Sequence, residues 1–325
     1  MKDYGTMRVF GCNAGSDMTD AICEKLNIKR GDALISTFKD GETRIEVYDN
    51  VRGADVFVVN PTNPPVTNFT EMMLLGSALR DASAGRVTLV IPYLGYNRQE
   101  RKDQGRIPFS AQDMIEVLKI SRADRVVLLD LHASATAEKF RPIIPDHLYA
   151  AYELIPELAE LFNGDKFVIA SPDAGGVTRA RKYADMIARH KKTDEIAELV
   201  IFHKRRPKPG EVGDIHIAGE VADHDVLIVD DMIDSGGTLI ACAETAKKAG
   251  AKRIVAVAVH GLFSDGAVKR LEESPIDEVV IADSIPLSEE AKNSKTIRIV
   301  SVAPLFAKAI RLLNEGESFS ELFIN

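Results

Sequence analysis

Residues 226–238, VLIVDDMIDSGGT, constrain the fold of this chain more than any other stretch. The first four residues are apolar and mostly β-branched, a pattern typical of a buried strand in a parallel sheet. Two carboxylates, Asp230 and Asp231, follow at the carboxyl end of this strand, where open α/β sheets bind their ligands. Residues 239–249 have a helical pattern, and Gly250 is a helix stop signal. The stretch therefore predicts a strand, a tight loop and a helix within an α/β domain.

The loop between that strand and helix has the composition of a phosphate-binding loop. Glycine lets the backbone approach an anion closely, and the first N–H groups of a helix point toward it. We expect Gly237 to need a backbone conformation that suits glycine alone. The acids cannot bind a phosphate directly, but their oxygens suit sugar hydroxyls or a phosphate-bound metal. The loop thus predicts a sugar phosphate site, with an ordinary turn and solvated acids as the alternative. The residues of this predicted site are Asp230, Asp231, Asp234, Ser235, Gly236, Gly237 and Thr238.

Length and composition narrow the class of protein. The 325 residues and the alternating strand and helix patterns predict an α/β protein with two domains. The 41 basic and 49 acidic residues give a net charge of −8, which argues against a nucleic-acid partner and requires local basic clusters to hold an anion. Three cysteines without metal-ligand spacing fit a reducing compartment. No signal peptide or membrane-spanning apolar run is recognisable, so we expect a cytoplasmic protein without a membrane partner.

The chain contains two similar segments. Residues 54–95 follow the order strand, polar loop, helix, glycine, strand, and residues 225–261 follow it again. Such units are common in α/β folds, so chance is the alternative; we favour duplication because the second strand of each unit ends in a similar glycine loop. The predicted sugar phosphate loop is present only in the second segment. We place a domain boundary near residue 150, with a helix at 151–162 opening the second domain.

Six blocks distributed along the chain carry a family resemblance. They are FKDGETRIEV (38–47), PYLGYNRQERK (92–102), RVVLLDLHA (125–133), SPDAGGVTRAR (171–181), the VDDMIDSGGT stretch and SVAPLFAKAI (301–310). One block alone would be weak, but six in this order resemble the ribose-phosphate pyrophosphokinases, or phosphoribosyl pyrophosphate synthetases. The resemblance implies two similar domains of the type I phosphoribosyltransferase fold, each a mainly parallel sheet flanked by helices. It assigns residues 1–150 to the first domain and 151–302 to the second, with the tail 303–325 packed on the first.

The resemblance also implies an activity. Members of this family transfer the β,γ-diphosphoryl group of ATP to the C1 hydroxyl of ribose 5-phosphate, which gives phosphoribosyl pyrophosphate and AMP for nucleotide biosynthesis. The chain must hold ATP in an unusual way, because it has neither a Walker motif nor a kinase-type Gly-rich loop. The resemblance further implies Mg²⁺ as the cofactor and a homo-oligomer built from dimers. Whether the assembly is a hexamer or smaller stays open.

Each site residue implied by the resemblance has a simpler interpretation as well. Lys204 is implied to be the catalytic lysine and Arg206 a substrate contact, both in a lid at residues 204–213; the alternative is a solvated run of surface charge. His132 and Asp173 are implied to contact metal or triphosphate, although a histidine at a strand end is more often structural. The implied ATP-binding residues are Asp40, Gly41 and Glu42, contributed by a neighbouring subunit, with Arg98 and Gln99.

The chain departs from the family pattern at several positions. His203 precedes the lysine where family members commonly have Asp, and Asn50 and residues 134–144 differ beside the allosteric site of the class that has one. We therefore expect altered or absent phosphate activation. Two other functions stay open. A phosphoribosyltransferase would not need the N-terminal blocks, and a catalytically silent synthetase subunit would have lost site residues that are present here.

Overall fold

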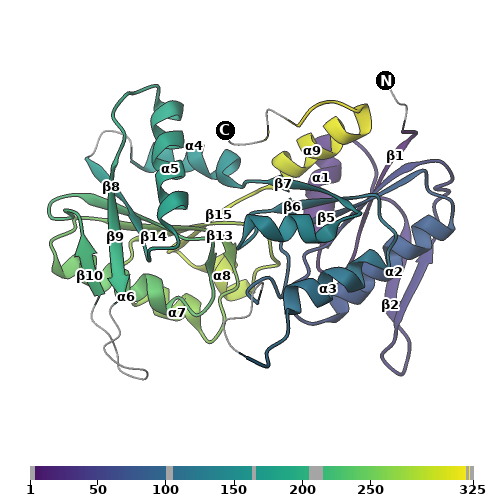
Figure 1. Ribbon diagram of the computed structural model, residues 1–325, viewed down its shortest axis with the longest axis horizontal. Helices are drawn as coiled ribbons and strands as arrows, with labels where there is room; N and C mark the ends of the chain where they lie inside the picture. The colour runs from purple at the N-terminus through teal and green to yellow at the C-terminus, as the bar shows by residue number, and fades with distance from the viewer. Residues whose placement is uncertain (1–3, 100–104, 163–165, 205–214, 320–321, 323–325) are drawn as a thin grey trace. The chain divides into compact units, whose positions relative to one another are not determined.

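The computed structural model describes residues 4–99, 105–162, 166–204, 215–319 and 322 (Figure 1). The chain divides into two compact units. The first contains Met1–Ala150, Ser284–Pro286 and Val302–Asn325, and the second contains Ala151–Asp283 and Leu287–Ser301. Each unit is a mainly parallel sheet flanked by helices, which confirms the predicted α/β class. Within the described ranges, no helix combines the length and the apolar character needed to cross a bilayer.

The first unit has a five-stranded parallel sheet in the order β1-β4-β5-β6-β7. Helices α1 and α9 cover one face and α2 and α3 the other (Figure 1). A separate antiparallel hairpin, β2 and β3, packs on α2. The elements are β1 (Met7–Gly11), α1 (Ser16–Leu26), β2 (Ala33–Thr37), β3 (Thr43–Val47), β4 (Asp55–Val59), α2 (Thr67–Asp81), β5 (Arg86–Ile91), α3 (Ser110–Lys119), β6 (Arg125–Leu129), the 3₁₀ helix η1 (Ser134–Phe140), β7 (Ile144–Leu148) and α9 (Ala303–Glu315).

The second unit has a larger sheet in the order β10-β9-β8-β11-β13-β14-β15, parallel except for the β9–β10 pair, and the short β12 pairs with β13. Helices α4 and α5 lie on one face and α6 and α7 on the other (Figure 1). The elements are α4 (Ala151–Leu161), β8 (Phe167–Ser171), α5 (Val177–Lys191), β9 (Glu198–Lys204), β10 (Ile215–Ala218), β11 (Asp225–Val229), β12 (Met232–Ile233), α6 (Gly237–Lys248), β13 (Ile254–Gly261), α7 (Ala267–Glu272), β14 (Glu278–Ala282), α8 (Glu289–Asn293) and β15 (Ile297–Val300).

The predicted repeat is present as two strand–helix–strand units, β4-α2-β5 and β11-α6-β13, in which the two strands pair directly and in parallel. Strands β4 and β11 are buried along their whole length, which explains why each is apolar after its first residue, an aspartate. Helix α6 buries four residues at helical spacing and ends as predicted, because Gly250 adopts φ +95° just beyond it. The four are Leu239, Cys242, Ala243 and Ala246.

The C-terminal helix α9 is fixed to the first unit by a buried ionic cluster. Arg86 at the start of β5 donates to both carboxylate oxygens of Asp55, at 2.8 and 2.6 Å, and to the carbonyl of Leu313 in α9 at 2.7 Å. Asn314 adds a bond of 3.0 Å to Asp55, and the ring of Tyr4 lies 3.7 Å from the Arg86 guanidinium. Because Asp55 is fully buried, these donors are what allow it to remain inside the unit.

Candidate active site

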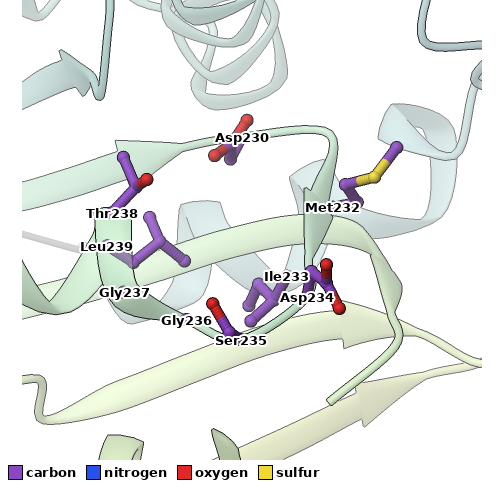
Figure 2. Close-up of a pocket in the computed structure, with 9 residues that line it drawn as sticks. All are labelled: Asp230, Met232, Ile233, Asp234, Ser235, Gly236, Gly237, Thr238 and Leu239. Atoms are coloured by element: carbon purple, nitrogen blue, oxygen red, sulfur yellow. The ribbon is translucent and has the colours of Figure 1, made fainter. Parts of the chain in front are cut away.

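The loop after β11 forms a pocket of about 120 Å³ at the carboxyl edge of the second sheet. Figure 2 shows its residues following the chain from the end of β11 to the first turn of α6. The strand fixes the start of the loop, because Asp230 donates its backbone N–H to the carbonyl of Val257 in β13 at 2.9 Å. Six of the seven predicted site residues line the pocket. The lining is Asp230, Met232, Ile233, Asp234, Ser235, Gly236, Gly237, Thr238 and Leu239.

The glycine pair shapes the start of α6. Gly236 is the N-cap residue and adopts φ +74°, a conformation that costs other residues free energy. Gly237 is the first helical residue and has no positive φ, so our expectation for Gly237 was wrong and the requirement falls on Gly236. The first i to i+4 bond of the helix joins Ile240 N–H to the Gly236 carbonyl at 3.0 Å. The N–H groups of residues 237–239 therefore precede the helical bonding and suit an anion.

The two acids at the end of β11 have different surroundings. Asp230 lines the pocket, whereas Asp231 is only 6% exposed and does not. Asp231 accepts a hydrogen bond of 3.1 Å from Met232 N–H, and its carbonyl accepts from Val259 and His260. Our prediction treated both acids as equal acceptors for sugar hydroxyls. Of the two, only Asp230 is among the residues that line the pocket, and Asp231 is the more buried.

Asp230 has an altered acidity. Burial, followed by the neighbouring Asp231, raises its pKa from 3.8 to about 7, while Arg179 opposes this rise. The Asp230 carboxylate accepts a hydrogen bond of 2.9 Å from the backbone N–H of Asp231. A group with this pKa is partly protonated at neutral pH, so small changes in its surroundings alter its capacity to accept hydrogen bonds.

Two residues that follow β13 support the outer part of the loop. Ser264, in the segment between β13 and α7, donates its hydroxyl to the Asp234 carboxylate and its N–H to the Asp234 carbonyl at 3.1 Å. Arg270 in α7 donates to the Ser235 carbonyl at 2.7 Å. These contacts fix the backbone of the loop, and one oxygen of Asp234 is already engaged by Ser264. Neither supporting residue was predicted, because only the folded sheet brings them to the loop.

The predicted metal-site residues lie at strand ends in different units. Asp173 follows β8, is exposed, and accepts a hydrogen bond of 2.9 Å from Gly176 N–H at the start of α5. His132 follows β6 in the first unit and is also exposed. In the part of the chain that the structure describes, no group of three or more His, Cys, Asp or Glu residues forms a metal site.

The predicted ATP-binding turn lies at the tip of the β2–β3 hairpin. Its residues are exposed, Gly41 adopts φ +95°, and the Asp40 carboxylate accepts from Glu42 N–H at 3.1 Å. Phe38 beside the turn is 50% exposed. These features describe a turn closed by its own hydrogen bonds, with its residues exposed to solvent.

The two other predicted ATP contacts, Arg98 and Gln99, follow β5 and are exposed. Gln99 is held at the start of α3, where Ser110 donates its hydroxyl to the Gln99 side chain and Ala111 N–H donates to the Gln99 carbonyl at 3.4 Å. The adjacent Asn97 is buried, and its side-chain oxygen has no hydrogen-bond partner among the described residues.

Lys204 is the last residue of β9 and pairs with Ile215 of β10, so the predicted lid joins the two strands of an antiparallel edge pair. Arg206 and most of the predicted lid lie outside the described residues, as does the side chain of Lys204. The neighbouring His203 is exposed and faces His216 across the strand pair.

A further residue of the site was missed by the sequence analysis. Arg179, in the first turn of α5, lies 3.7 Å from an Asp230 oxygen and 3.6 Å from an Asp231 oxygen. The sequence offered one signal, since Arg179 belongs to the block SPDAGGVTRAR. Its proximity to the acids depends on the pairing of β8 with β11, which the sequence alone did not specify.

Comparison with known proteins extends the likeness over nearly the whole chain. A family model described as the N-terminal domain of ribose phosphate pyrophosphokinase matches residues 7–121, and one described as the phosphoribosyl synthetase-associated domain matches residues 168–324. The chain is 41% identical to a ribose-phosphate pyrophosphokinase of Haemophilus influenzae, over 98% of this chain and 99% of that protein. It is 40% identical to one of Hyphomonas neptunium, with the same two coverages.

A solved structure supports the same relationship. The phosphoribosylpyrophosphate synthetase of Mycobacterium smegmatis matches with a TM-score of 0.87 at 30% identity, over 96% of this chain and 99% of that one. A match over 96% of the chain extends across both units, and the family model for residues 168–324 contains the pocket loop. The chain therefore belongs to the ribose-phosphate pyrophosphokinase family.

Proposed function

We propose that this chain transfers the β,γ-diphosphoryl group of ATP to the C1 hydroxyl of ribose 5-phosphate and releases phosphoribosyl pyrophosphate and AMP. The observation that carries the proposal is the pocket after β11, where a left-handed glycine, a helix N-terminus and the acid Asp230 are combined. This combination suits a ligand with a phosphate at one end and hydroxyls at the other. The chain's family membership supplies the reaction.

In this proposal the ribose 5-phosphate site is the pocket loop. The N–H groups at the start of α6 hold the phosphate, with the hydroxyls of Ser235 and Thr238 beside it. Asp230 accepts hydrogen bonds from the ribose hydroxyls, which orients C1 away from the phosphate cradle. We give Asp231 and Asp234 supporting roles in ribose 5-phosphate binding, since Asp231 is buried and the pocket-lining Asp234 carboxylate is engaged by Ser264.

ATP binding is assigned to the β2–β3 turn and to the start of α3. The exposed Asp40, Gly41 and Glu42 fit a turn that completes the ATP site of a neighbouring subunit, while Arg98 and Gln99 act in their own chain. This arrangement makes the active enzyme a homo-oligomer, at least a dimer. If dimers dissociate on dilution, activity per chain falls with protein concentration.

The residues present fit Mg²⁺ bound mainly through the triphosphate. Asp173 is exposed, and its carboxylate is a hard oxygen ligand beside the start of α5. Mg²⁺ normally keeps several water and phosphate ligands, so one protein carboxylate is sufficient. When bound, the ion neutralises charge on the phosphate oxygens. We assign His132 of the first unit to contacting the triphosphate or its metal, as the family resemblance implies.

The chemical step requires in-line attack by the C1 oxygen on the β-phosphorus, cleavage of the bond to the α,β-bridging oxygen, and departure of AMP. We assign Lys204 to stabilising the charge that develops on the transferred group, and Arg206 to binding phosphate oxygens in both the ground state and the transition state. Both assignments follow from the family resemblance, which implies that these residues belong to a lid.

The decisive experiment measures AMP formed from ATP and Mg²⁺ with and without ribose 5-phosphate. We expect AMP only when the sugar phosphate is present, together with an equal amount of phosphoribosyl pyrophosphate. Absence of AMP from a folded, oligomeric protein would favour a silent synthetase subunit. Consumption of phosphoribosyl pyrophosphate with a nucleobase, without AMP formation, would favour a phosphoribosyltransferase. Repeating the assay with phosphate and with ADP tests the altered regulation expected from Asn50 and residues 134–144.

A further inference from the structure

Arg179 holds an unusual position relative to the two acids at the end of β11. One terminal nitrogen of its guanidinium lies 3.7 Å from Asp230 and the other lies 3.6 Å from Asp231. Both distances are longer than a hydrogen bond, so the guanidinium interacts by charge without occupying acceptor sites on either carboxylate. The approach of Arg179 therefore leaves the Asp230 oxygens able to accept hydrogen bonds from another ligand.

The fold explains how Arg179 reaches these acids. Strands β8 and β11 are parallel neighbours, so their carboxyl ends lie at the same edge of the sheet. Helix α5 begins beyond β8, and Arg179 is its third residue. The Arg179 side chain is 27% exposed, and the Asp230 and Asp231 side chains are 22% and 9% exposed, so the three charges interact in a partly desolvated site. Charge interactions are stronger there than at a fully exposed surface.

The pair of acids creates a difficulty for an anionic ligand. Two adjacent carboxylates repel one another, and both repel an incoming sugar phosphate. Hydrogen bonds from hydroxyls are strongest when the acceptor is ionised, so neutralising the acids by protonation would weaken the recognition of the sugar. A cation that reduces the repulsion without protonating either acid resolves the difficulty.

We propose that Arg179 is a positioning residue for the sugar, which offsets the charge of Asp230 and Asp231 so that Asp230 accepts hydrogen bonds from the sugar hydroxyls. The inference rests on the proposed function, because it takes the pocket ligand to be ribose 5-phosphate. It adds detail to that function. Recognition of the sugar hydroxyls depends on Arg179, whereas recognition of the phosphate depends on the start of α6.

The acidity of Asp230 supports this role. Two charged groups act on the Asp230 carboxyl: Asp231 in its own loop raises its pKa and Arg179 from α5 lowers it. Removing Arg179 must therefore raise the pKa of Asp230 above its present value of about 7. The carboxyl then becomes more protonated at neutral pH, and its ability to accept hydrogen bonds recovers only at higher pH.

The test compares the binding of ribose 5-phosphate with that of 2-deoxyribose 5-phosphate by calorimetry, between pH 6 and pH 9. Both ligands carry the same phosphate, so its own titration cancels in the ratio of their affinities. The variants are Arg179→Met and Arg179→Lys. Arg181→Met is the matched control, since it removes the same charge from an exposed position two residues further along α5.

We expect wild type to prefer ribose 5-phosphate at pH 8, and Arg179→Met to reduce that preference by roughly tenfold, as the weakening of one charge-assisted hydrogen bond would. The preference of Arg179→Met should recover as the pH rises, with a midpoint above that of wild type. Arg179→Lys should retain most of the preference, and Arg181→Met should match wild type. If Arg179→Met does not fold, Arg179→Gln replaces it with the same expected result.

Two outcomes would overturn this inference and are distinguishable. If the variant loses affinity equally for both ligands at every pH, Arg179 has only a structural role while the proposed function stands. If wild type binds neither ligand, the proposed function itself fails, and the role of Arg179 fails with it.

Discussion

Asn60 and Asp230 occupy equivalent positions in the two units of this chain. Each follows the last residue of a buried strand, and each donates its backbone N–H to the neighbouring parallel strand, Asn60 to Val90 at 3.0 Å and Asp230 to Val257 at 2.9 Å. Their side chains have opposite roles. Asn60 is fully buried and donates to the carbonyl of Asn68 at 2.8 Å, whereas Asp230 lines a pocket. The same backbone geometry thus supports a packed core in one unit and a site in the other.

Asn60→Asp should lower the free energy of unfolding by roughly 2–4 kcal/mol at pH 8, because it buries a carboxylate that cannot donate to Asn68. Denaturation in urea measures this change. Asn50→Asp is the control, since Asn50 is exposed and its side-chain oxygen already accepts from Arg52 N–H at 3.1 Å, which an aspartate can also do. Equal stability of the two variants would contradict the buried role of Asn60.

Asp230→Asn should leave the fold intact and lower kcat/KM by about one to two decades, since hydrogen bonds to an ionised acceptor contribute about 1.5–3 kcal/mol. The loss follows from replacing two acceptor oxygens with one acceptor and one donor. Steady-state kinetics with both substrates varied provide the measurement. A variant within about twofold of wild type would support the simpler interpretation, a solvated acid beside an ordinary turn.

Asp230→Asn should also raise the free energy of unfolding, by an amount that depends on pH. The folded pKa of Asp230, about 7, exceeds the ordinary value of 3.8, so the folded protein favours the protonated carboxyl. The ionised form therefore costs free energy, and this cost appears between about pH 4 and pH 7 and is complete above that window. Asp230→Asn removes the cost, so its free energy of unfolding should exceed that of wild type at pH 8 and equal it near pH 4. A stability difference independent of pH would argue against the raised pKa.

Substitutions of the glycine pair should separate backbone strain from ligand approach. Gly236→Ala places a side chain at φ +74° and should cost about 1–2 kcal/mol of stability. Gly237→Ala should cost much less, because its nearest neighbour would be the Ser235 hydroxyl at 3.8 Å. Gly237→Val should lower ribose 5-phosphate affinity in a folded protein, because its branched side chain obstructs the approach of the phosphate. Calorimetry showing unchanged binding would remove Gly237 from the cradle.

Lys204→Ala should lower kcat by roughly a hundredfold and change both KM values little, if its charge acts mainly in the transition state. Charge that merely attracts anions predicts a different pattern: a raised KM, a normal kcat, and an effect that shrinks at high salt. Kinetics at two ionic strengths distinguish these patterns. A near-normal kcat at saturating substrates would end the catalytic assignment of Lys204.

Asp173→Asn should weaken the apparent affinity for Mg²⁺ by roughly tenfold, about 1.4 kcal/mol, with a smaller effect on ribose 5-phosphate. Asparagine keeps an oxygen that can accept from Gly176 N–H, so the start of α5 should be preserved. Asp173→Ala loses both functions and should also lower stability. If Asp173→Asn also loses stability, and its loss of Mg²⁺ affinity matches that loss of stability, the role of Asp173 is confined to the hydrogen bond with Gly176 N–H at the start of α5.

Local sequence patterns predicted the strand and the helix on either side of the pocket better than the backbone angles and side-chain contacts within it. The apolar run before Asp230 predicted a buried strand, and Gly250 predicted the end of the helix. Both predictions depend only on residues close together in the sequence, and both were confirmed. The assignment of unusual φ to Gly237 was wrong by one residue, because composition does not indicate where the loop ends and the helix begins. The difference between Asp230 and Asp231 depends on which carboxylate faces the core. Arg179 and Ser264 reach the loop through strand pairing and the β13–α7 connection, which no local pattern contains.

The contact between Arg86 and Leu313 has a consequence for the order in which the chain folds during translation. The two residues are 227 positions apart, and the whole second unit is synthesised between them. All residues of the second unit are therefore synthesised before α9. Most of the first unit is made earlier still but lacks α9, so the buried Arg86–Asp55 pair stays incompletely covered until α9 is made. Removal of α9 would thus damage the domain that is made first.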